Sequence, residues 1–479
     1  MSASKRFTLK ALASASVIAC TLGIAGQAQA AATIIINNIN QPGVGFNDTT
    51  PAVPVGGNTG TTLGQQRLIA FTYAANIWSA TLTSSVPIIV NAQFTPLTCS
   101  ATTGVLGSAG ATQIFADFAG AQRPNTWYAY ALANKLAGTN VATSPSPQIN
   151  SNFNSNLGTP GCLQASGWYY GLDGQEGTRI DFVAVLQHEM GHGLGFQTFT
   201  NGSTGAFNNG RPSIWDHFLF SAAANKNWVD ATATERAASS ISINGLIWTG
   251  PGVTAAVPSV LRFGQAAVTI SGVAAGAGAG TYIAGDSSLG PPVLGTSISG
   301  LLMPVAEQGA GAGSGCLPFN AANTLAVTGR VALVDRGICG FALKAKNAQN
   351  AGAIGVIIAN NAAGLLAPGG GDPLVTIPVL GITQAQGNTL KTALQTRSRA
   401  RSGVIASFGV FGTQYTGADL LGRAQMFAPN PFQGGSSVSH FGSAMFRNQL
   451  MEPAINADLT QSVLPPQDMT FRLFQDIGW

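Results

Sequence analysis

The stretch QHEMGHGLGFQTF, residues 187–199, places two histidines four positions apart, His188 and His192, with Glu189 directly after the first. On a helix, residues four apart lie on one face a turn apart, so both imidazoles can bind the same metal ion. Glu189 is rotated away from that line, where a carboxylate can accept a proton from water without binding the metal. The spacing predicts a zinc-dependent hydrolase in which Glu189 is the general base.

A catalytic zinc site uses three protein ligands and leaves a fourth position open for water or substrate. In the continuous form of this motif a third histidine would stand three residues after Gly195, but Thr198 occupies that position. Only four histidines occur in the chain, so few side chains can complete the ligand set. The candidates are the two other histidines and two carboxylates downstream of the motif, namely His217, His440, Asp216 and Glu235.

The helix that must carry the motif has recognisable ends. Asp181 can cap its first turn, and Gly195 is suited to its last turn because glycine readily adopts the left-handed conformation found there. An apolar flank for packing is supplied by Phe182, Val183, Val185 and Leu186. The sequence therefore predicts a helix that begins after Asp181 and ends near Gly195.

Residues 31–250 show the mixed pattern of an α+β unit. β-branched runs predict strands, and apolar residues at helical spacing predict helices. The expected strands are 33–37 and 86–94, and the expected helices are 64–82 and 127–139, the second ended by Gly138. The stretch after it is rich in glycine, asparagine and serine, carries Cys162 and predicts a loop. The final 70 residues have the same loop-rich composition.

A change of composition after residue 250 indicates a second unit. Residues 250–315 are rich in glycine, alanine, serine and proline. We interpret GAGAGSG there as a flexible loop and not as a phosphate loop, because no strand directly precedes it and no Gly-Lys-Ser/Thr follows. From residue 328 strands and helices alternate, which favours βαβ connections. The predicted strands are 330–335, 354–361 and 376–382, and the predicted helices are 341–353 and 386–394.

HEMGHGLGF, a distant SHF at 439–441 and then Leu450-Met451-Glu452-Pro453 together resemble the leishmanolysin-type metzincins. In that family the third histidine arrives from far along the chain, and a methionine turn after it forms a floor beneath the metal. The resemblance implies one zinc ion bound by His440 together with the two histidines of the motif, and Met451 as the turn residue. The fold class that it implies is α+β, with a metzincin-like zinc peptidase domain.

The long gap between the second and third ligands contains another resemblance. GRVALVDRGICGFALKAKNAQNAGAIGVIIANN, followed by IPVLGITQAQGNTL, resembles the protease-associated domain. This small α/β module is found inserted in several secreted peptidases and is generally credited with substrate access or protein interaction. The expected organisation is a peptidase domain interrupted by the module. The expected boundaries are a signal peptide at 1–30, peptidase parts at 31–250 and 411–479, and the inserted domain at 251–410.

The N-terminus and the cysteines both predict export. A basic start, an apolar stretch and Ala28-Gln29-Ala30 have the order of a secretory signal that is cleaved after Ala30. An alternative is a lipoprotein site ending at Cys20, which would leave that residue as a lipid anchor. The other four cysteines are an even number, and sequence proximity favours the disulfides Cys99–Cys162 and Cys316–Cys339. We expect a secreted protein, with periplasmic and lipid-anchored forms as alternatives.

The balance of charge bears on the partners. Without Lys5, Arg6 and Lys10 of the signal, 19 basic residues stand against 18 acidic ones. Nucleic-acid binders need clustered lysine and arginine, so no nucleic-acid partner is expected. No later segment offers about 20 uninterrupted apolar residues, so no transmembrane span is expected after the signal. We expect a monomer that acts on proteins or peptides. Whether calcium is bound beside zinc is not decided by the sequence.

The interpretation that best fits these features is a secreted zinc endopeptidase that hydrolyses peptide bonds in proteins with a metal-activated water and Glu189 as the base. One alternative is a catalytically weak or vestigial peptidase that acts as a secreted protein-binding or surface-interaction protein. A further alternative is a gluzincin-like peptidase in which Glu235 is the third ligand and His440 is dispensable.

Overall fold

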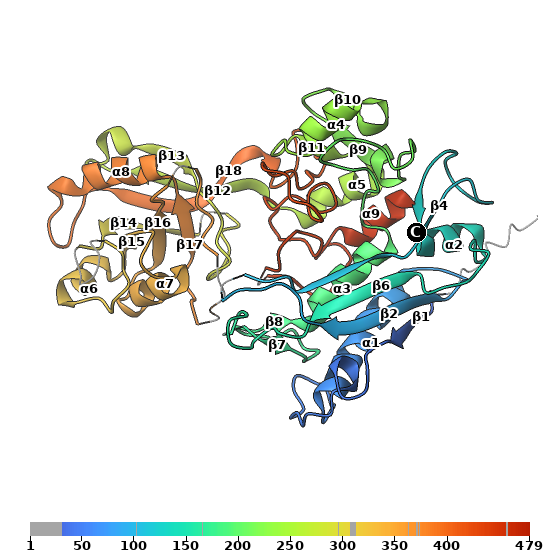
Figure 1. Ribbon diagram of the computed structural model, residues 1–479. Helices are drawn as coiled ribbons and strands as arrows, with labels where there is room; N and C mark the ends of the chain where they lie inside the picture. The colour runs from blue at the N-terminus through green and yellow to red at the C-terminus, as the bar shows by residue number, and fades with distance from the viewer. Residues whose placement is uncertain are drawn as a thin grey trace, which may run out of the picture.

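The structure is a computed structural model that describes residues 31–479, apart from 102, 165, 296, 307–312, 363, 370, 371, 373 and 457. The predicted signal peptide at 1–30 lies outside the described residues. Figure 1 shows two bodies that are joined by a pair of strands. One body contains the motif helix and both ends of the described chain. The other, at the left of the picture, is an inserted unit.

A four-stranded sheet organises the first body. Its strands are β1 (Ile34–Asn38), β2 (Ile88–Thr95), β6 (Ile149–Asn154) and β3 (Gly107–Ala111), in the order β1-β2-β6-β3. The first three run parallel, and β3 is an antiparallel strand at the edge. The prediction of a loop after the helix at 127–139 was wrong for residues 149–154, which form strand β6. Ile149 and Phe153 of this strand alternate into the core, while Asn150 lies on the open face and accepts a hydrogen bond from Asn91.

Two helices cover one face of this sheet. They are α1 (Leu63–Thr81) and α3 (Phe182–Leu194), which pack against each other and share one apolar core with β2 and β6. Both predicted ends of α3 are confirmed. The Asp181 side chain accepts the Val183 N–H at its start, and Gly195 ends it in the left-handed conformation. Gly138, in the left-handed conformation with φ 69°, ends α2 (Tyr130–Ala137) as predicted.

A further layer of helices packs beside α3. α5 (Pro251–Val260) lies against α9 (Thr470–Ile477), and the buried residues of both belong to the first core. The predicted boundary at residues 250 and 251 therefore falls just before a helix that packs in the first body. Short elements complete this body: η1 (Gly45–Asn47), β4 (Ile114–Phe115), β5 (Tyr128–Ala129), β7 (Trp168–Tyr169), β8 (Ile180–Asp181), η2 (Trp215–Phe218), β9 (Leu219–Ser221), β10 (Lys226–Asn227), η3 (Trp228–Asp230), α4 (Ala233–Ser239) and β11 (Leu246–Trp248).

The inserted unit is built on a seven-stranded sheet in the order β13-β12-β18-β14-β15-β16-β17. The strands are β12 (Phe263–Ser271), β13 (Gly280–Ile283), β14 (Ile298–Pro304), β15 (Val331–Asp335), β16 (Gly355–Ala359), β17 (Val379–Ile382) and β18 (Ile405–Tyr415). The helices are α6 (Ala321–Val327), α7 (Phe341–Asn350) and α8 (Gln384–Ala393), with short turns η4 (Gly276–Gly278) and η5 (Leu394–Thr396). The strands from β14 to β17 are parallel, which confirms the predicted βαβ rhythm.

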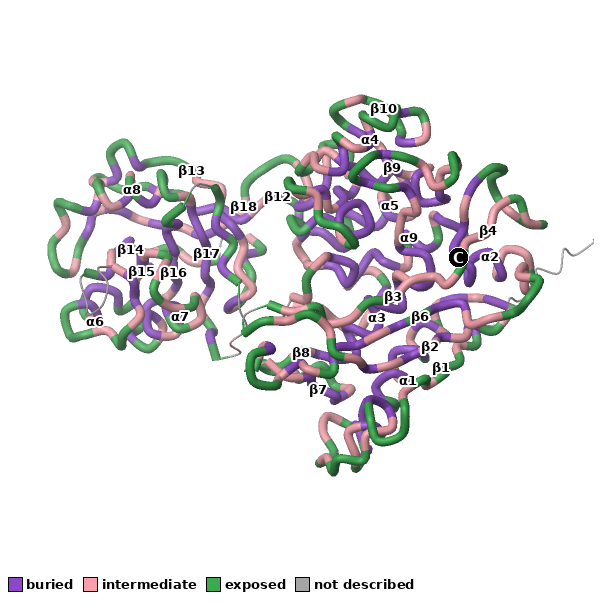
Figure 2. The backbone as a smooth tube through the Cα atoms, viewed as in Figure 1, coloured by how far each residue is buried: buried purple, intermediate pink, exposed green. Residues whose placement is uncertain are grey.

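Two apolar cores lie on the two faces of this sheet. One includes Leu390 of α8, and the other includes Val327 of α6 and Ala345 of α7. Figure 1 shows the same division, with α8 on one side of the strands and α6 and α7 on the other. Figure 2 shows buried residues gathered in the interior of each body.

The two bodies meet where β12 leaves the first body and β18 returns to it as an antiparallel pair. The Arg262 guanidinium lies at this junction and donates to both carboxylate oxygens of Asp286, at 2.7 and 2.6 Å. It also lies 4.5 Å from the ring centre of Phe446 in the first body. Arg262 therefore contacts both bodies at once.

Each body contains one disulfide. Cys99 pairs with Cys162 in the first body, and Cys316 pairs with Cys339 in the inserted unit. Both pairings were predicted. In the part of the chain that the structure describes, no helix has the length and apolar character that crossing a membrane requires.

Candidate metal centre

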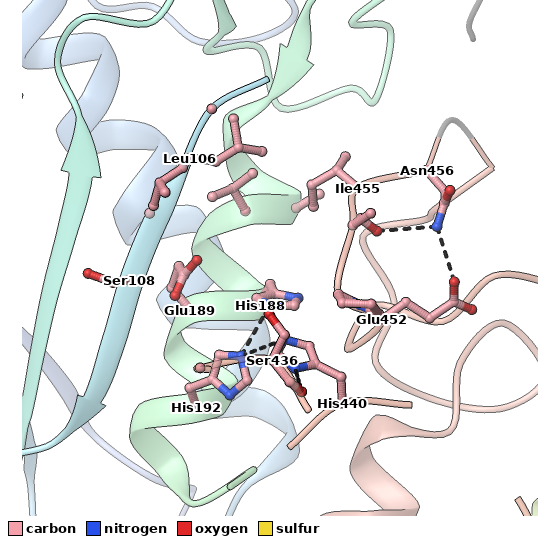
Figure 3. A pocket seen from close by; sticks show the side chains of 18 of the residues that line it. Leu106, Ser108, His188, Glu189, His192, Ser436, His440, Glu452, Ile455 and Asn456 are labelled. Carbon is pink, nitrogen blue, oxygen red and sulfur yellow. Dashed lines mark hydrogen bonds between the residues drawn. The ribbon is translucent and has the colours of Figure 1, made fainter. Parts of the chain in front are cut away.

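Three histidines meet at the surface of α3 that faces the C-terminal segment. His188 and His192 lie one turn apart on α3, and His440 comes from the segment between β18 and α9. Figure 3 shows the three rings pointing toward one another. The Nε2 atom of His192 lies 3.1 Å from Nε2 of His188 and 3.1 Å from Nε2 of His440, and the third distance is 3.3 Å. Among the described residues, this is the one group of three or more side chains placed to hold a metal ion.

The other nitrogen of each ring fixes its tautomer. Nδ1 of His188 lies 2.8 Å from the Leu450 carbonyl oxygen, and Nδ1 of His192 lies 2.8 Å from that of Phe196. Nδ1 of His440 lies 2.8 Å from the carbonyl oxygen of Ser436. A carbonyl oxygen can only accept, so each Nδ1 carries the proton and each Nε2 presents a lone pair. Three lone pairs therefore converge on one point.

Burial keeps these rings neutral. It lowers the pKa of His188, lowers that of His192 well below the ordinary value, and lowers that of His440 to about 3. The cause is the loss of hydration that the charged imidazolium would suffer. Neutral imidazole is the form of histidine that binds a metal.

The spacing of the three nitrogens suits a tetrahedral ion. Two nitrogens that are each ~2.0–2.1 Å from one zinc ion at tetrahedral angles are about 3.3–3.4 Å apart. The observed distances of 3.1, 3.1 and 3.3 Å are close to this value. Three neutral imidazoles with a fourth direction open to a cavity are also the donor set of a catalytic zinc site. The residues present therefore fit zinc.

Glu189 lies beside the histidines and against the edge strand β3. Its carboxylate accepts a hydrogen bond from the Ala109 N–H. A Cβ atom added to Gly107 would lie only 3.1 Å from Glu189 Oε1, so the strand approaches the carboxylate closely. Burial raises the pKa of Glu189 to about 8. A cation at the three imidazoles would act in the opposite direction, because a positive charge nearby favours the ionised carboxylate.

The end of α3 directs the chain away after the second histidine. Gly195 has φ 119°, a conformation that favours glycine, and the Phe196 N–H donates to the Gly191 carbonyl oxygen. This turn brings the Phe196 carbonyl oxygen to Nδ1 of His192. Thr198 then points away from the histidines, and its hydroxyl donates to Asp216 Oδ1 at 2.6 Å.

Met451 lies beneath the helix between the two motif histidines. A Cβ atom added to Gly191 would be 2.8 Å from the Met451 sulfur, so the absence of a side chain at Gly191 makes this contact possible. The Met451 side chain is fully buried. Its carbonyl oxygen accepts the N–H of Phe441, the residue after His440. Met451 thus packs against α3 and is tied to the segment that carries His440.

The other ligand candidates lie elsewhere. His217 Nε2 lies 3.1 Å from the Thr126 hydroxyl oxygen, and Asp216 accepts hydrogen bonds from Thr198, Thr200 and Ser213. Glu235 pairs with Lys226 at 2.7 Å and caps α4. The Lys226 hydrogen bond is the largest reason why the pKa of Glu235 is lowered to about 2. The structure brings none of these three candidates into the histidine group.

A cavity of about 1730 Å³ opens onto the histidines and Glu189. Its walls come from several parts of the chain, among them Gly107–Ala109 of β3, Phe432–Ser437, Glu452–Asn456, and Ser288 with Gly369 of the inserted unit. Figure 3 shows β3 on one side of the histidines and the segment with Glu452 and Ile455 on the other. β3 is the last strand of its sheet, so no strand among the described residues pairs with its outer edge. Gly107–Ala109 of this edge strand line the cavity.

Some of these residues carried no signal in the sequence. The β3 stretch GSAGA consists of small residues with none of the β-branched or aromatic side chains that mark strands. Its pairing with β6 alone makes it a strand and places it beside Glu189. Ser288 and Gly369 likewise lie in stretches whose composition indicated only loops.

The inserted unit matches a known family. The family model described as the PA domain matches residues 299–390. Residues 299–390 are a PA domain. The whole fold is thus mixed α/β with an inserted PA domain, as the second resemblance implied. The match lies within β14 to α8 and leaves the histidine site outside it.

Comparisons with single proteins cover only part of the chain. A protein described as a probable lipoprotein aminopeptidase of Mycobacterium tuberculosis is 36% identical over 124 residues, which is 24% of this chain and 25% of that protein. Among solved structures, an aminopeptidase from Aneurinibacillus sp. strain AM-1 is 24% identical over 32% of this chain and 31% of its own, with a TM-score of 0.23. A zinc aminopeptidase from Bacillus subtilis is 23% identical over 33% and 36%, with a TM-score of 0.22. This chain therefore spans about a quarter of the curated relative and about a third of each solved chain.

Proposed function

We propose that this chain is a zinc peptidase that cleaves peptide bonds within proteins. The three Nε2 lone pairs, 3.1–3.3 Å apart at the base of a large cavity and beside the Glu189 carboxylate, carry the proposal. His188, His192 and His440 are the proposed ligands. Such a set of ligands, with an adjacent base, belongs to hydrolysis and has no use in a purely structural site, where the fourth position is closed by protein.

The chemistry divides between the metal and the chain. A zinc ion held there would polarise the scissile carbonyl and make a water acidic, with a pKa toward ~7. Glu189 accepts the proton of the attacking water and passes it to the leaving amine. The Ala109 N–H donates a hydrogen bond to the carboxylate and holds it in place.

The outer edge of β3 supports an extended protein substrate. An edge strand presents unpaired backbone groups, so a peptide can add to it as a further strand. Gly107–Ala109 of this edge lie next to Glu189, which would place the scissile bond beside the base. The cavity has walls on both sides of the histidines, with Leu106 and Ser108 on one side and Glu452 and Ile455 on the other, as an internal stretch of a substrate chain requires (Figure 3).

We further propose the metzincin organisation that the sequence resemblance implies. Supporting it are the helix that ends at Gly195, the third histidine 248 residues beyond His192, and the burial of Met451 beneath α3. In this proposal a peptidase body made from both ends of the chain is interrupted by the PA domain. Two disulfides support a secreted location.

An aminopeptidase is the second candidate. The partial curated relative favours it, because that protein is described as a probable aminopeptidase. Such an enzyme must bind the free α-amine of its substrate beside the metal, whereas an endopeptidase accepts a blocked N-terminus. The vestigial, binding-only alternative predicts zinc without cleavage of either substrate.

Two fluorescence-quenched peptides of the same sequence separate these candidates, one with a free and one with an acetylated N-terminus. We expect the zinc-loaded chain to cleave both at the same internal bond. The Glu189→Gln variant, which keeps the shape of the side chain but not its basicity, should retain zinc and lose at least about 10²-fold in kcat. Removal of single residues from the free peptide alone would favour the aminopeptidase. Cleavage of neither peptide by a zinc-loaded chain would overturn the proposal.

A further inference from the structure

We propose that Asp468 is a positioning residue of the metal centre, which it serves by fixing the main chain that holds His188. This inference rests on the proposed zinc site. Asp468 lies in the segment just before α9 and is 2% exposed. It touches none of the three histidines, and the proposed reaction does not use it.

Leu450 is the link between Asp468 and the centre. The Leu450 N–H donates to Asp468 Oδ2 at 2.6 Å. The Leu450 carbonyl oxygen accepts the Nδ1 proton of His188 at 2.8 Å. The Leu450 N–H is thus held by the Asp468 carboxylate, and the Leu450 carbonyl oxygen orients the ring of His188, a proposed ligand. Partners of this kind fix the tautomer and the ring orientation of metal-binding histidines.

The same segment reaches the third ligand. The carbonyl oxygen of Met451 accepts the N–H of Phe441, next to His440. Leu450 and Met451 therefore connect the histidine of α3 with the histidine that comes from a distant part of the chain. A shift of this two-residue segment would change the spacing between the two Nε2 atoms.

Asp468 is anchored on its other side. Its Oδ1 accepts the Thr470 N–H at 2.6 Å at the start of α9, and the Met469 N–H donates to the side chain of Gln449 at 2.8 Å. Hydrogen bonds to a carboxylate are about twice as strong as neutral ones. Because both oxygens of Asp468 accept, an amide at this position would direct an NH₂ group at a backbone N–H.

Zinc affinity is the measurement that tests this role. The dissociation constant would be obtained by competition with a chromophoric chelator for the wild type, Asp468→Asn and Asp476→Asn. Asp476 is the matched control, because it lies on α9 itself and accepts hydrogen bonds from Trp248 Nε1 and the Gly252 N–H, away from Leu450. We expect Asp468→Asn to bind zinc about 10–100-fold more weakly, as for other outer partners of metal ligands. Asp476→Asn should stay within about threefold of the wild type.

The visible absorption of the cobalt-substituted protein gives a second readout, because it reports ligand geometry independently of folding stability. It should shift in Asp468→Asn and match the wild type in Asp476→Asn. Asp468→Ser serves if the asparagine variant does not fold. A serine hydroxyl can still accept the Thr470 N–H two residues on, but it is too short to reach Leu450 as well. The same loss of affinity is expected.

Wild-type affinity and spectrum in a folded Asp468 variant would overturn the inference and leave the proposed function intact. Equal losses in the Asp468 and Asp476 variants would also overturn it, because loosening of α9 would then explain both. A wild-type chain that bound no zinc would overturn the proposed function first.

Discussion

Thr198 donates a hydrogen bond from its hydroxyl to Asp216 Oδ1 at 2.6 Å, and it occupies the position where a continuous motif would carry its third histidine. The Thr198 N–H in turn donates to the Ser439 hydroxyl at 3.2 Å, directly before His440. The loop after α3 therefore does not supply a ligand. It is fixed by a buried carboxylate and supports the segment from which the third histidine comes.

Asp216→Asn should destabilise the first body. Asp216 is fully buried, and its oxygens accept two threonine hydroxyls and the Ser213 N–H. An amide replaces one acceptor by a donor, so we expect a loss of about 2–4 kcal/mol in the free energy of unfolding, measured in urea. Asp117→Asn is the control, because its ion pair with Arg211 is exposed and should contribute under about 1 kcal/mol. Equal stabilities of the two variants would contradict this assignment.

The part of the site that is local in sequence was predictable. The i, i+4 spacing of His188 and His192, the cap Asp181 and the terminating Gly195 act within one helix, so their pattern alone predicts their geometry. The convergence of His440 is different. It lies 248 residues beyond His192, and only the resemblance singled it out from the other candidates, because no periodicity links residues across an inserted domain.

Strands without strand propensity were not predictable. In β6, INSNFN, asparagine disfavours strands in isolation, but Ile149 and Phe153 pack in the core and the asparagines pair across neighbouring strands. The hydrogen bonds of Asp216 and Asp468 could not be predicted either. Their carboxylates accept from Thr198 and from the Leu450 N–H, and only the fold brings these groups together.

Gly107→Ala should reduce catalysis without removing the metal. The new Cβ would lie 3.1 Å from Oε1 of Glu189, the proposed base, and displace it by a few tenths of an ångström. We expect roughly a tenfold lower kcat, because small misplacements of catalytic groups are costly. Gly110→Ala in the same strand meets nothing nearer than 3.9 Å and should match the wild type. Steady-state kinetics beside elemental analysis of zinc would test this, and a fall in zinc content in Gly107→Ala would argue against it.

His217→Gln should weaken the pH dependence of stability in mild acid. Burial, with a contribution from Arg123, lowers the pKa of His217 to about 4, from 6.5. Between these values the unfolded chain binds more protons, so the stabilising effect is complete above pH 6.5 and is lost as the pH falls toward 4. The side chain is only partly exposed, and screening by solvent reduces the effect to about 1–2 kcal/mol.

The measurement is urea unfolding of both proteins at pH 7 and at pH 4.5. Glutamine can still donate to the Thr126 oxygen that lies 3.1 Å from His217 Nε2, so little stability should be lost at pH 7. The wild type should lose more stability than the variant on acidification. Parallel curves for the two proteins would show that His217 titrates normally in the folded chain.

Arg262→Ala should loosen the junction between the first body and the inserted unit. The guanidinium is 5% exposed and binds Asp286 through two hydrogen bonds, and its loss leaves a half-buried carboxylate without its partner. We expect a cost of about 2–4 kcal/mol, measured by chemical unfolding. Lys391→Ala removes the more exposed ion pair with Asp335 in the inserted unit and should cost under about 1 kcal/mol. Equal losses in the free energy of unfolding for the two variants would show that the buried Arg262 ion pair contributes no more than the exposed Lys391 pair.

Zinc content per chain decides whether His440 is the third ligand. Elemental analysis would be made on the chain from residue 31 onward and on its His440→Ala and His217→Ala variants, after dialysis against metal-free buffer. We expect about one zinc in the wild type and in His217→Ala, where the fourth histidine of the chain is removed, and almost none in His440→Ala. A His440→Ala chain that kept one zinc would contradict this expectation, because the third ligand would then lie elsewhere.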